Sequence, residues 1–156
     1  MRIEIVSVSA KQPAWVNEAF DHYAKRFKGG SALSLRELPL GRRGPSMPLA
    51  RAVGQEGEKM LSATARADRR IALDERGRSL DTAELARRLE DWARVGSTVA
   101  LMVGGPDGLS PACLDAADEC WSLSALTLPH GLVRVIAAEA LYRAWSLNRG
   151  HPYHRA

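Results

Sequence analysis

Short apolar runs alternate with amphipathic stretches along all 156 residues of this chain, and the alternation limits the folds open to it. Strands that alternate with helices favour a mostly parallel sheet covered by helices on both faces. The run Thr98 to Val103 is the most apolar, which is typical of a strand buried on both sides. We therefore expect an α/β fold. One domain covering residues 1–156 is expected, because no repeat or long linker divides the sequence.

The expected elements follow from the spacing of apolar residues and from the prolines and caps between them. Strands are expected at 3–9, 33–38, 70–73, 98–103 and 124–128, and helices at 13–27, 48–64, 81–95, 132–147 and briefly from 111. Asp81 is placed to cap the helix expected at 81–95. Glu139 and Arg143 are four residues apart, so their side chains can pair along the helix expected at 132–147. One apolar face is predicted in that last helix, made of Val133, Ile136, Ala137, Ala140, Leu141, Ala144 and Trp145.

Composition excludes several classes of protein. Hydrophobic residues make up 46% and charged residues 26%, as in ordinary water-soluble domains. The apolar runs stop well short of the roughly 18 residues that a membrane span needs, so no membrane segment is expected. The start of the chain contains Glu4 and alternates like a strand, unlike a secretory leader, so a cytoplasmic location is expected. Cys113 and Cys120 fit no redox or zinc spacing, so we expect packing thiols and no metal site.

Positive charge is unevenly distributed along the chain. The net charge is +4, and no acidic residue follows Glu139, whereas Arg149, Arg155 and two histidines do. Further clusters of cations lie earlier, at Lys25, Arg26, Lys28, Arg42 and Arg43. Such surfaces favour a phosphate-rich partner such as RNA, although an ordinary solvated surface explains the same charge equally well.

A glycine-rich turn, Gly104 to Gly108 (GGPDG), follows the most apolar strand. Its spacing matches neither the dinucleotide-binding motif nor a P-loop. Glycines let backbone N–H groups approach a ligand, although a tight connection explains the same residues equally well. Ligands of parallel sheets bind beyond the carboxyl ends of the strands, where Leu73, Gly104 and residues 123–128 would converge. The sequence therefore predicts one ligand site at that edge, with the basic tail beside it.

Three segments carry a resemblance to a known family: LMVGGPDGLSP at 101–111, WSLSALTLPHGLVRV at 121–135 and EALYRAWSLNRGHPYHR at 139–155. They are similar to the bacterial large-subunit rRNA pseudouridine N3-methyltransferases of the SPOUT class, and the likeness covers the whole chain. The resemblance implies a parallel sheet with a C-terminal trefoil knot, a homodimer, and S-adenosylmethionine bound in the knot. It also implies methylation of N3 of a pseudouridine in 23S rRNA at the ribosomal subunit interface, with the assembled ribosome as substrate.

Carried onto this chain, the resemblance places S-adenosylmethionine against three segments. The implied cofactor positions are Leu73, Gly104 and the run Leu123, Ser124, Ala125, Leu126, Thr127 and Leu128, with Gly105 added as the neighbour of Gly104. The leucines can sandwich the flat adenine while backbone groups bond to its edges, although a core position explains some of them as well. The glycines would keep the methionine end of the cofactor free of Cβ clashes.

Two histidines are candidates for a general base, because the target N3 is an imide nitrogen that must lose its proton. They are His130, where a capping or loop role is equally compatible with the sequence, and His154 in the tail; we expect neither to be indispensable alone. Tyr153 can stack on a base, and Arg143 and Arg155 can engage phosphates, the alternative being a frayed terminus.

Other hypotheses come from different classes of protein. A non-catalytic ribosome-binding or assembly protein with a vestigial nucleotide pocket would use the same basic surface. A nucleotide-dependent oxidoreductase is disfavoured by the glycine spacing. Trp121, Trp145 and the last helix carry more apolar surface than a terminal element needs, which favours a homodimer. If the site is shared, one subunit would hold the cofactor while the other grips RNA.

Overall fold

The chain folds around a sheet of five parallel strands. The computed structural model describes residues 1–155, apart from the side chain of His154. The strands are β1 (Arg2–Val8), β2 (Ala32–Leu38), β3 (Arg69–Ser79), β4 (Thr98–Val103) and β5 (Glu119–Ser122). Their order is β2-β1-β4-β3-β5, and every neighbouring pair is parallel. The α/β class expected from the sequence is confirmed.

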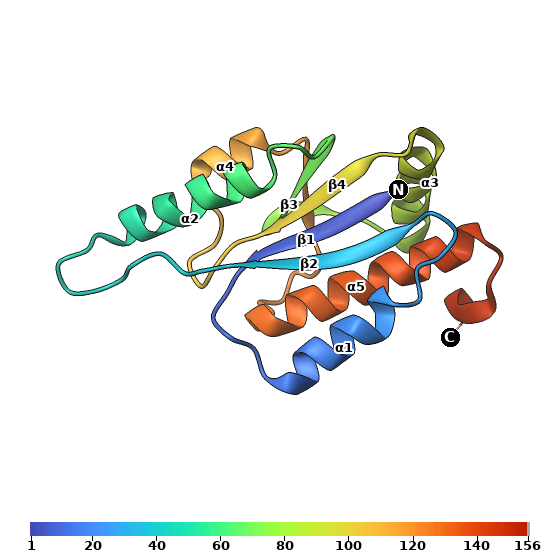
Figure 1. Ribbon diagram of the computed structural model, residues 1–156, viewed down its shortest axis with the longest axis horizontal. Helices are drawn as coiled ribbons and strands as arrows, with labels where there is room; N and C mark the ends of the chain where they lie inside the picture. The colour runs from blue at the N-terminus through green and yellow to red at the C-terminus, as the bar shows by residue number, and fades with distance from the viewer. Residues whose placement is uncertain (156) are drawn as a thin grey trace.

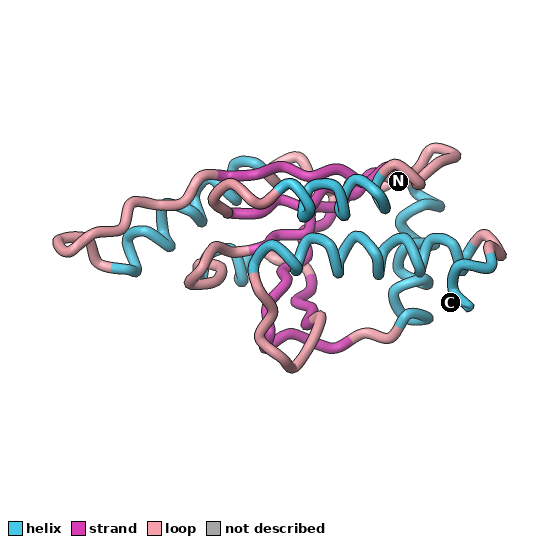
Figure 2. Tube along the Cα trace, turned by 90° about the horizontal axis from the view of Figure 1, so that it is seen from below, coloured by secondary structure: helices cyan, strands magenta, loops and turns pink. Residues whose placement is uncertain are grey.

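Helices cover both faces of this sheet (Figure 1). On one face lie α1 (Ala14–Ala24), α3 (Thr82–Val95) and α5 (His130–Asn148), and on the other lie α2 (Leu49–Ala63) and α4 (Pro111–Ala116). A short 3-10 helix, η1 (Pro152–Arg155), follows α5. Figure 2 shows α5 running alongside the strands, and in Figure 1 both termini lie on the same side of the molecule.

Side chains of the central strand β4 alternate between two apolar clusters. Val99, Leu101 and Val103 belong to the cluster beneath α1, α3 and α5, whereas Met102 belongs to the one beneath α2 and α4. None of the four is more than 4% exposed. Burial on both faces accounts for the continuous apolar run, so this prediction is confirmed. Cys113 lies in the second cluster, and both cysteines are free thiols.

Asp81 caps α3, as predicted. Its side chain accepts a hydrogen bond of 2.7 Å from the backbone N–H of Glu84, whose carboxylate in turn accepts from the backbone N–H of Asp81 at 3.1 Å. Gly96 ends the helix in the left-handed region with φ 69°. A cap of this kind is worth about 1 kcal/mol, which helps to set the beginning of the helix from local sequence alone.

The structure corrects the position of the last strand. Residues 124–128, predicted as a strand, form an irregular loop, and β5 lies earlier, where it pairs with β3. In the loop, Ser124 Oγ accepts a hydrogen bond of 3.0 Å from the backbone N–H of Leu126, and Ser122 Oγ donates to the Ser124 carbonyl at 2.9 Å. Serine side chains thus satisfy backbone groups that a neighbouring strand would otherwise satisfy.

The buried face of α5 differs from the predicted apolar stripe, and the helix begins two residues earlier than expected. Ala137 and Leu141 are buried, as predicted, but Val133 and Ile136 are only half-buried. The buried face instead contains Arg134, whose side chain is fully enclosed. Hydrophobic spacing located the helix, but it could not reveal a charged residue within the face that packs inward.

Candidate active site

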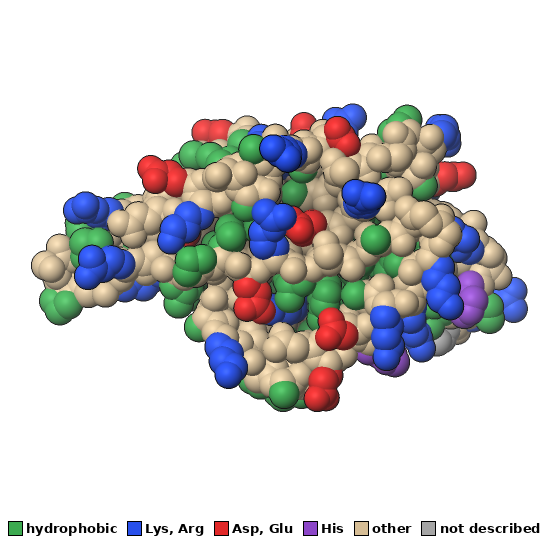
Figure 3. Space-filling model, in the orientation of Figure 1, with side chains coloured by type: hydrophobic (Ala, Val, Ile, Leu, Met, Phe, Trp, Pro, Cys, Tyr) green, Lys and Arg blue, Asp and Glu red, His purple; other side chains and the backbone are tan. Residues whose placement is uncertain are grey.

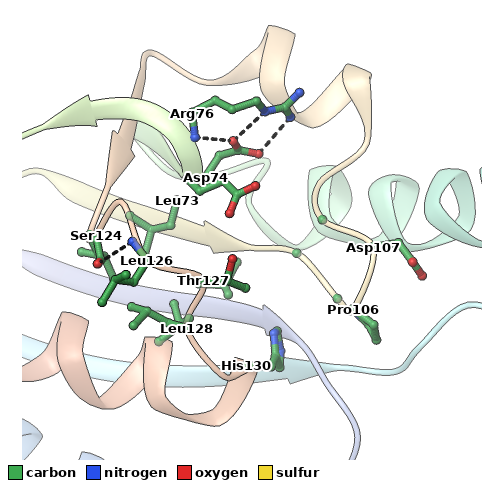
Figure 4. Close-up of a pocket in the computed structure, with 17 residues that line it drawn as sticks. Leu73, Asp74, Arg76, Pro106, Asp107, Ser124, Leu126, Thr127, Leu128 and His130 are labelled. Carbon is green, nitrogen blue, oxygen red and sulfur yellow. Dashed lines mark hydrogen bonds and ion pairs between the residues drawn. The ribbon is translucent and has the colours of Figure 1, made fainter.

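A cavity of about 650 Å³ lies at the carboxyl end of β4, beside the part of β3 where its pairing with β4 stops at Leu73. Its wall is formed by three segments that are distant in sequence: residues 73–76 in β3, residues 103–108 after β4, and parts of 123–133. Figure 4 shows the loop before α5 on one side of the cavity and the glycine turn on another, with Leu73 and Asp74 between them. The three segments come together as predicted, but residues 73–76 lie within β3, which continues to Ser79 instead of ending at Leu73. The segment around residues 123–128 contributes as the loop that follows β5.

The glycine turn is shaped by the packing of the chain upon itself. The backbone N–H of Gly108 donates a 3.0 Å hydrogen bond to the Gly105 carbonyl, and Gly108 has φ +82°. A Cβ on Gly104 would overlap the backbone of Gly108, and one on Gly105 would lie 3.1 Å from an Oε of Glu56. Contacts within the protein therefore exclude a side chain at Gly104 and crowd one at Gly105, a different reason from the predicted clearance for a ligand. Because these glycines have no side chains, the wall of the cavity at this turn consists of backbone atoms.

The opposite wall is mostly apolar. Among the predicted cofactor residues, those that line the cavity are Leu73, Gly104, Gly105, Leu123, Ser124, Leu126, Thr127 and Leu128. Ala125 is exposed and is not one of the lining residues. Leu126 is 75% exposed, far more than a leucine held only by core packing, whereas Leu73 is 9% exposed. This arrangement offers apolar faces to a flat ring system and leaves backbone groups at its edges.

Acidic side chains complete the cavity, and the sequence prediction did not include them as site residues. Asp74, Glu75 and Asp107 all line it. Arg76 donates to both carboxylate oxygens of Asp74, at 2.9 and 3.1 Å, and these hydrogen bonds hold the pKa of Asp74 below its ordinary value. Asp74 is therefore ionised at neutral pH. Carboxylates in the wall suit a ligand that carries positive charge.

His130 lies at the lower edge of the cavity in Figure 4, as the first residue of α5. Its Nε2 is 3.3 Å from Ser7 Oγ at the end of β1. Burial, followed by the positive charge of Arg134, lowers the pKa of His130 below its ordinary value. A neutral imidazole carries a lone pair on one ring nitrogen, so it can accept a proton.

Arg134 is a functional candidate that sequence reasoning missed. Its Nη1 donates to Glu37 Oε1 at 2.6 Å and its Nη2 donates to Ser9 Oγ at 2.8 Å. These contacts hold the first turns of α5, including His130, against the carboxyl ends of β1 and β2. The only signal in the sequence was an arginine within an apolar stretch, and its partners lie too far away in sequence to be inferred.

The basic tail lies far from the cavity within one chain. It follows the end of α5, whereas the cavity meets the start, and 19 residues of helix span about 28 Å. Tyr153 donates to Glu139 Oε1 at 3.1 Å and packs edge-on against Tyr142 at 4.8 Å. The guanidinium of Arg143 lies 5.0 Å from the centre of the Tyr153 ring. Within one chain the basic tail is therefore not beside the cavity, because a long helix separates them.

Within the tail, Tyr153 packs against α5. Arg143 pairs with Glu139 at 2.5 Å, as the spacing predicted. Burial, then hydrogen bonding to Tyr23 and the nearby charge of Glu139, raise the pKa of Tyr153 above its ordinary value. Arg155 is exposed, and the side chain of the predicted His154 lies outside the described residues.

Within the described part of the chain, no group of three or more metal-binding side chains comes together. No helix there is both long and apolar enough to cross a membrane.

Comparison with known proteins identifies the family. The family described as "Predicted SPOUT methyltransferase" matches residues 1–154. The chain belongs to the SPOUT methyltransferase family. This SPOUT protein is 54% identical over 155 residues to "Ribosomal RNA large subunit methyltransferase H" of Thioalkalivibrio sulfidiphilus, with 99% of each chain covered. A protein of the same name from Alkalilimnicola ehrlichii is 53% identical over 156 residues, with 100% of each chain covered.

Solved structures agree with this SPOUT fold. A methylase family protein from Neisseria gonorrhoeae superposes with a TM-score of 0.56 at 16% identity, covering 90% of this chain and 80% of that one. Another methylase family protein, from Haemophilus influenzae, superposes with a TM-score of 0.57 at 14% identity, and the match covers 97% of this chain and 69% of that one. At such low identity the likeness concerns the fold alone.

Family membership makes the protein a methyltransferase with S-adenosylmethionine as its methyl donor. The cavity fits this donor on three observations. Its volume lies within the range of small-molecule sites, about 300–1,000 Å³. It offers apolar walls for adenine and a backbone wall at the glycine turn. Glu75 in its wall offers a carboxylate to the positive charge of the sulfonium and amino groups, whereas Asp74 and Asp107 are already paired with Arg76 and Arg43.

Proposed function

We propose that this SPOUT protein methylates N3 of a pseudouridine in 23S rRNA, at the subunit interface of the assembled ribosome. The relatives carry the name of a large-subunit rRNA methyltransferase and match the chain over its whole length. The observation that carries the proposal is the cavity at the carboxyl end of β4 and beside β3, which is lined by the residues that the resemblance assigns to the cofactor apart from Ala125.

In this proposal the leucines Leu73, Leu123, Leu126 and Leu128 hold the adenine of S-adenosylmethionine between them. Backbone groups of Ser124, Ala125 and Thr127 bond to the edges of the ring, and the methionine end lies along Gly104 and Gly105. Ala125 takes part through its backbone, because its side chain is exposed. The bound donor supplies an electrophilic methyl carbon. The protein's contribution is to hold it in line with the target nitrogen, which at best is worth about 7–11 kcal/mol.

The target nitrogen must lose its proton before or during methyl transfer. His130 is proposed to accept it, a role supported by its lowered pKa and its position in the cavity wall. General base assistance would contribute about 10²–10⁴-fold to the rate. His154 is the second candidate. Neither is proposed to be indispensable alone, since alignment supplies the larger part of the acceleration.

The distance between tail and cavity favours a homodimer with a shared site. Within one chain the tail follows the far end of α5, and Tyr153 reaches back only to Glu139, which lies about 14 Å along the helix from His130. In a dimer, the tail of one subunit would lie beside the cavity of the other, where Tyr153 stacks on the target nucleotide and Arg143 and Arg155 engage phosphates. The half-buried Ile136 of α5 supports a partner at that surface, whereas Val133 lines the cavity. A trefoil knot and a cytoplasmic location complete the proposal.

Two measurements test the function. Calorimetric titration of the protein with S-adenosylmethionine should show saturable binding. Mass spectrometry of 23S rRNA from a strain that lacks the gene should show unmethylated pseudouridine, which becomes N3-methylated when the gene is restored. Donor binding without any change in rRNA modification would contradict the proposal, and would favour a ribosome-binding or assembly protein with a vestigial pocket.

A further inference from the structure

A loop between β2 and α2, residues 39–48, extends away from the sheet and returns as α2 (Figure 1). We call this segment the arm. Figure 3 shows Lys and Arg side chains on the protruding side of the molecule to which the arm belongs. The sequence predicts Arg42 and Arg43 as candidate ribosome contacts there. The structure distinguishes the two, because the guanidinium of Arg43 is paired with acidic side chains of the protein itself.

Arg43 bridges two carboxylates that come from different parts of the fold. Its Nε and Nη2 donate to Asp107 Oδ2 in the glycine turn, at 3.1 and 2.8 Å. Its Nη2 and Nη1 donate to the two oxygens of Glu56 in α2, at 2.9 and 3.3 Å. The guanidinium is therefore a clamp that joins the arm, α2 and the turn. Arg43 itself is not one of the residues lining the cavity.

Glu56 is the buried member of this clamp. Only 3% of the residue is exposed, and besides Arg43 its Oε2 accepts a 3.4 Å hydrogen bond from the backbone N–H of Gly41. Its carboxylate lies directly against the glycine turn, because a Cβ on Gly105 would be 3.1 Å from Oε2. A buried carboxylate is stable only when it is paired and hydrogen-bonded. Arg43 thus neutralises the buried carboxylate of Glu56, against which the glycine turn packs.

We propose that Arg43 is a positioning residue for the methyl-donor pocket: through Asp107 and Glu56 it holds the glycine turn where it forms a wall of the cavity. This inference rests on the proposed function, since it concerns the site that holds S-adenosylmethionine. The turn has one internal backbone hydrogen bond, between Gly105 and Gly108, and its side-chain anchor is Asp107. Loss of that anchor lets the turn move away from the donor without removing any group that touches it.

The first test compares Arg43→Gln with Arg43→Lys by calorimetric titration with S-adenosylmethionine. Arg43→Gln should raise the Kd for the donor about tenfold, because charged hydrogen bonds to both carboxylates are lost. Arg43→Lys should restore part of the affinity, because an ammonium keeps the charge but lacks the planar fork that reaches both partners. Arg51→Gln is the matched control: Arg51 is an exposed arginine of α2, outside the cavity wall, and its replacement should leave the Kd unchanged.

A second set of variants separates positioning from folding. Arg43→Gln leaves Glu56 as an unpaired buried charge, so the double variant Arg43→Gln/Glu56→Gln removes that charge and should fold with the same weakened donor binding. In a double-mutant cycle with Asp107→Asn, the effect of Arg43→Gln on the Kd should largely disappear, since the anchor is already broken. Full additivity, or an unchanged Kd in a folded Arg43 variant, would overturn the inference. Absence of donor binding by the unmodified protein would instead refute the proposed function.

Discussion

Arg134 donates a hydrogen bond of 2.6 Å to Glu37, although the two residues are 97 positions apart in the sequence. The arginine is fully buried, whereas the glutamate side chain is 42% exposed. The Nη2 group of Arg134 is satisfied by Ser9, and its Nε is buried without a partner among the described residues. The pair fastens the start of α5 to the ends of β1 and β2, beside His130.

This asymmetry of burial predicts that the two partners differ in their effect on stability. Glu37→Ala leaves the Arg134 charge buried and uncompensated, so it should lower the free energy of unfolding by about 3–5 kcal/mol. Arg134→Met fills similar space without a charge and leaves a glutamate that reaches water, so its cost should be smaller, about 1–2 kcal/mol. Urea denaturation of both variants measures the difference. Equal losses, or a larger loss for Arg134→Met, would contradict the assignment of Arg134 as the buried charge.

The glycine turn predicts a sharp difference between two alanine substitutions. In Gly104→Ala the new Cβ overlaps the backbone of Gly108, so the turn must shift. We expect a loss of about 2–3 kcal/mol in stability together with impaired binding of S-adenosylmethionine. Gly54→Ala is the control, because a Cβ in that position of α2 has no neighbour within 4 Å. It should stabilise the protein by about 0.5–1 kcal/mol and leave donor binding intact. Thermal unfolding of both variants measures the change in stability, and calorimetric titration measures the binding of S-adenosylmethionine.

The lowered pKa of His130 predicts a pH dependence of stability. The unfolded chain takes up a proton at His130 near its ordinary pKa of about 6.5, whereas the folded protein does so only at lower pH. Because the unfolded state binds more protons in that window, stability should fall as the pH drops below about 6.5 and down to the folded pKa. A His130→Gln variant should lack this part of the pH dependence. An NMR titration that places the His130 pKa at or above 6.5 would refute the prediction.

The same histidine predicts a limited loss of activity. His130→Ala should reduce the rate of methylation by about 10²-fold, since general base assistance is removed while alignment of the donor remains. Single-turnover assays on ribosomes measure this loss, with the donor Kd as the control. A loss greater than about 10⁴-fold with unchanged donor affinity would show that His130 is indispensable, contrary to the proposal.

The position of the tail predicts that donor binding and methyl transfer can be separated. Deletion of residues 153–156 should leave the Kd for S-adenosylmethionine near that of the full chain, because α5 keeps the tail far from its own cavity. Methylation of ribosomes should be abolished.

Mixed dimers test whether the tail acts on the partner subunit. An equal mixture of the tail deletion and Gly104→Ala should recover about a quarter of full activity, because half of the dimers then contain one complete shared site. A mixture as inactive as its components would contradict the shared site, as would full activity of the truncated protein alone.

Local patterns in the sequence predicted most of the fold. The run Thr98 to Val103 coincides with β4, Asp81 caps α3, and the glycine turn lies at the end of β4. Each of these features depends on a few neighbouring residues, whose spacing or backbone preference is visible in one stretch of chain. The strand predicted at 124–128 was wrong because its residues resemble a strand locally, while pairing with β3 is decided by the preceding residues.

The amino-acid sequence by itself determined the alternating architecture, the cavity wall of leucines and glycines, and the family to which the chain is similar. Only the tertiary structure decided that Arg43 clamps the glycine turn, that Arg134 is buried against Glu37, and that α5 separates the tail from the cavity. The reason is that charged side chains find their partners across long separations, 64 residues for Arg43 and Asp107. The local spacing of apolar residues does not indicate such a partner, because the packing of helices on the sheet determines which charged side chains meet.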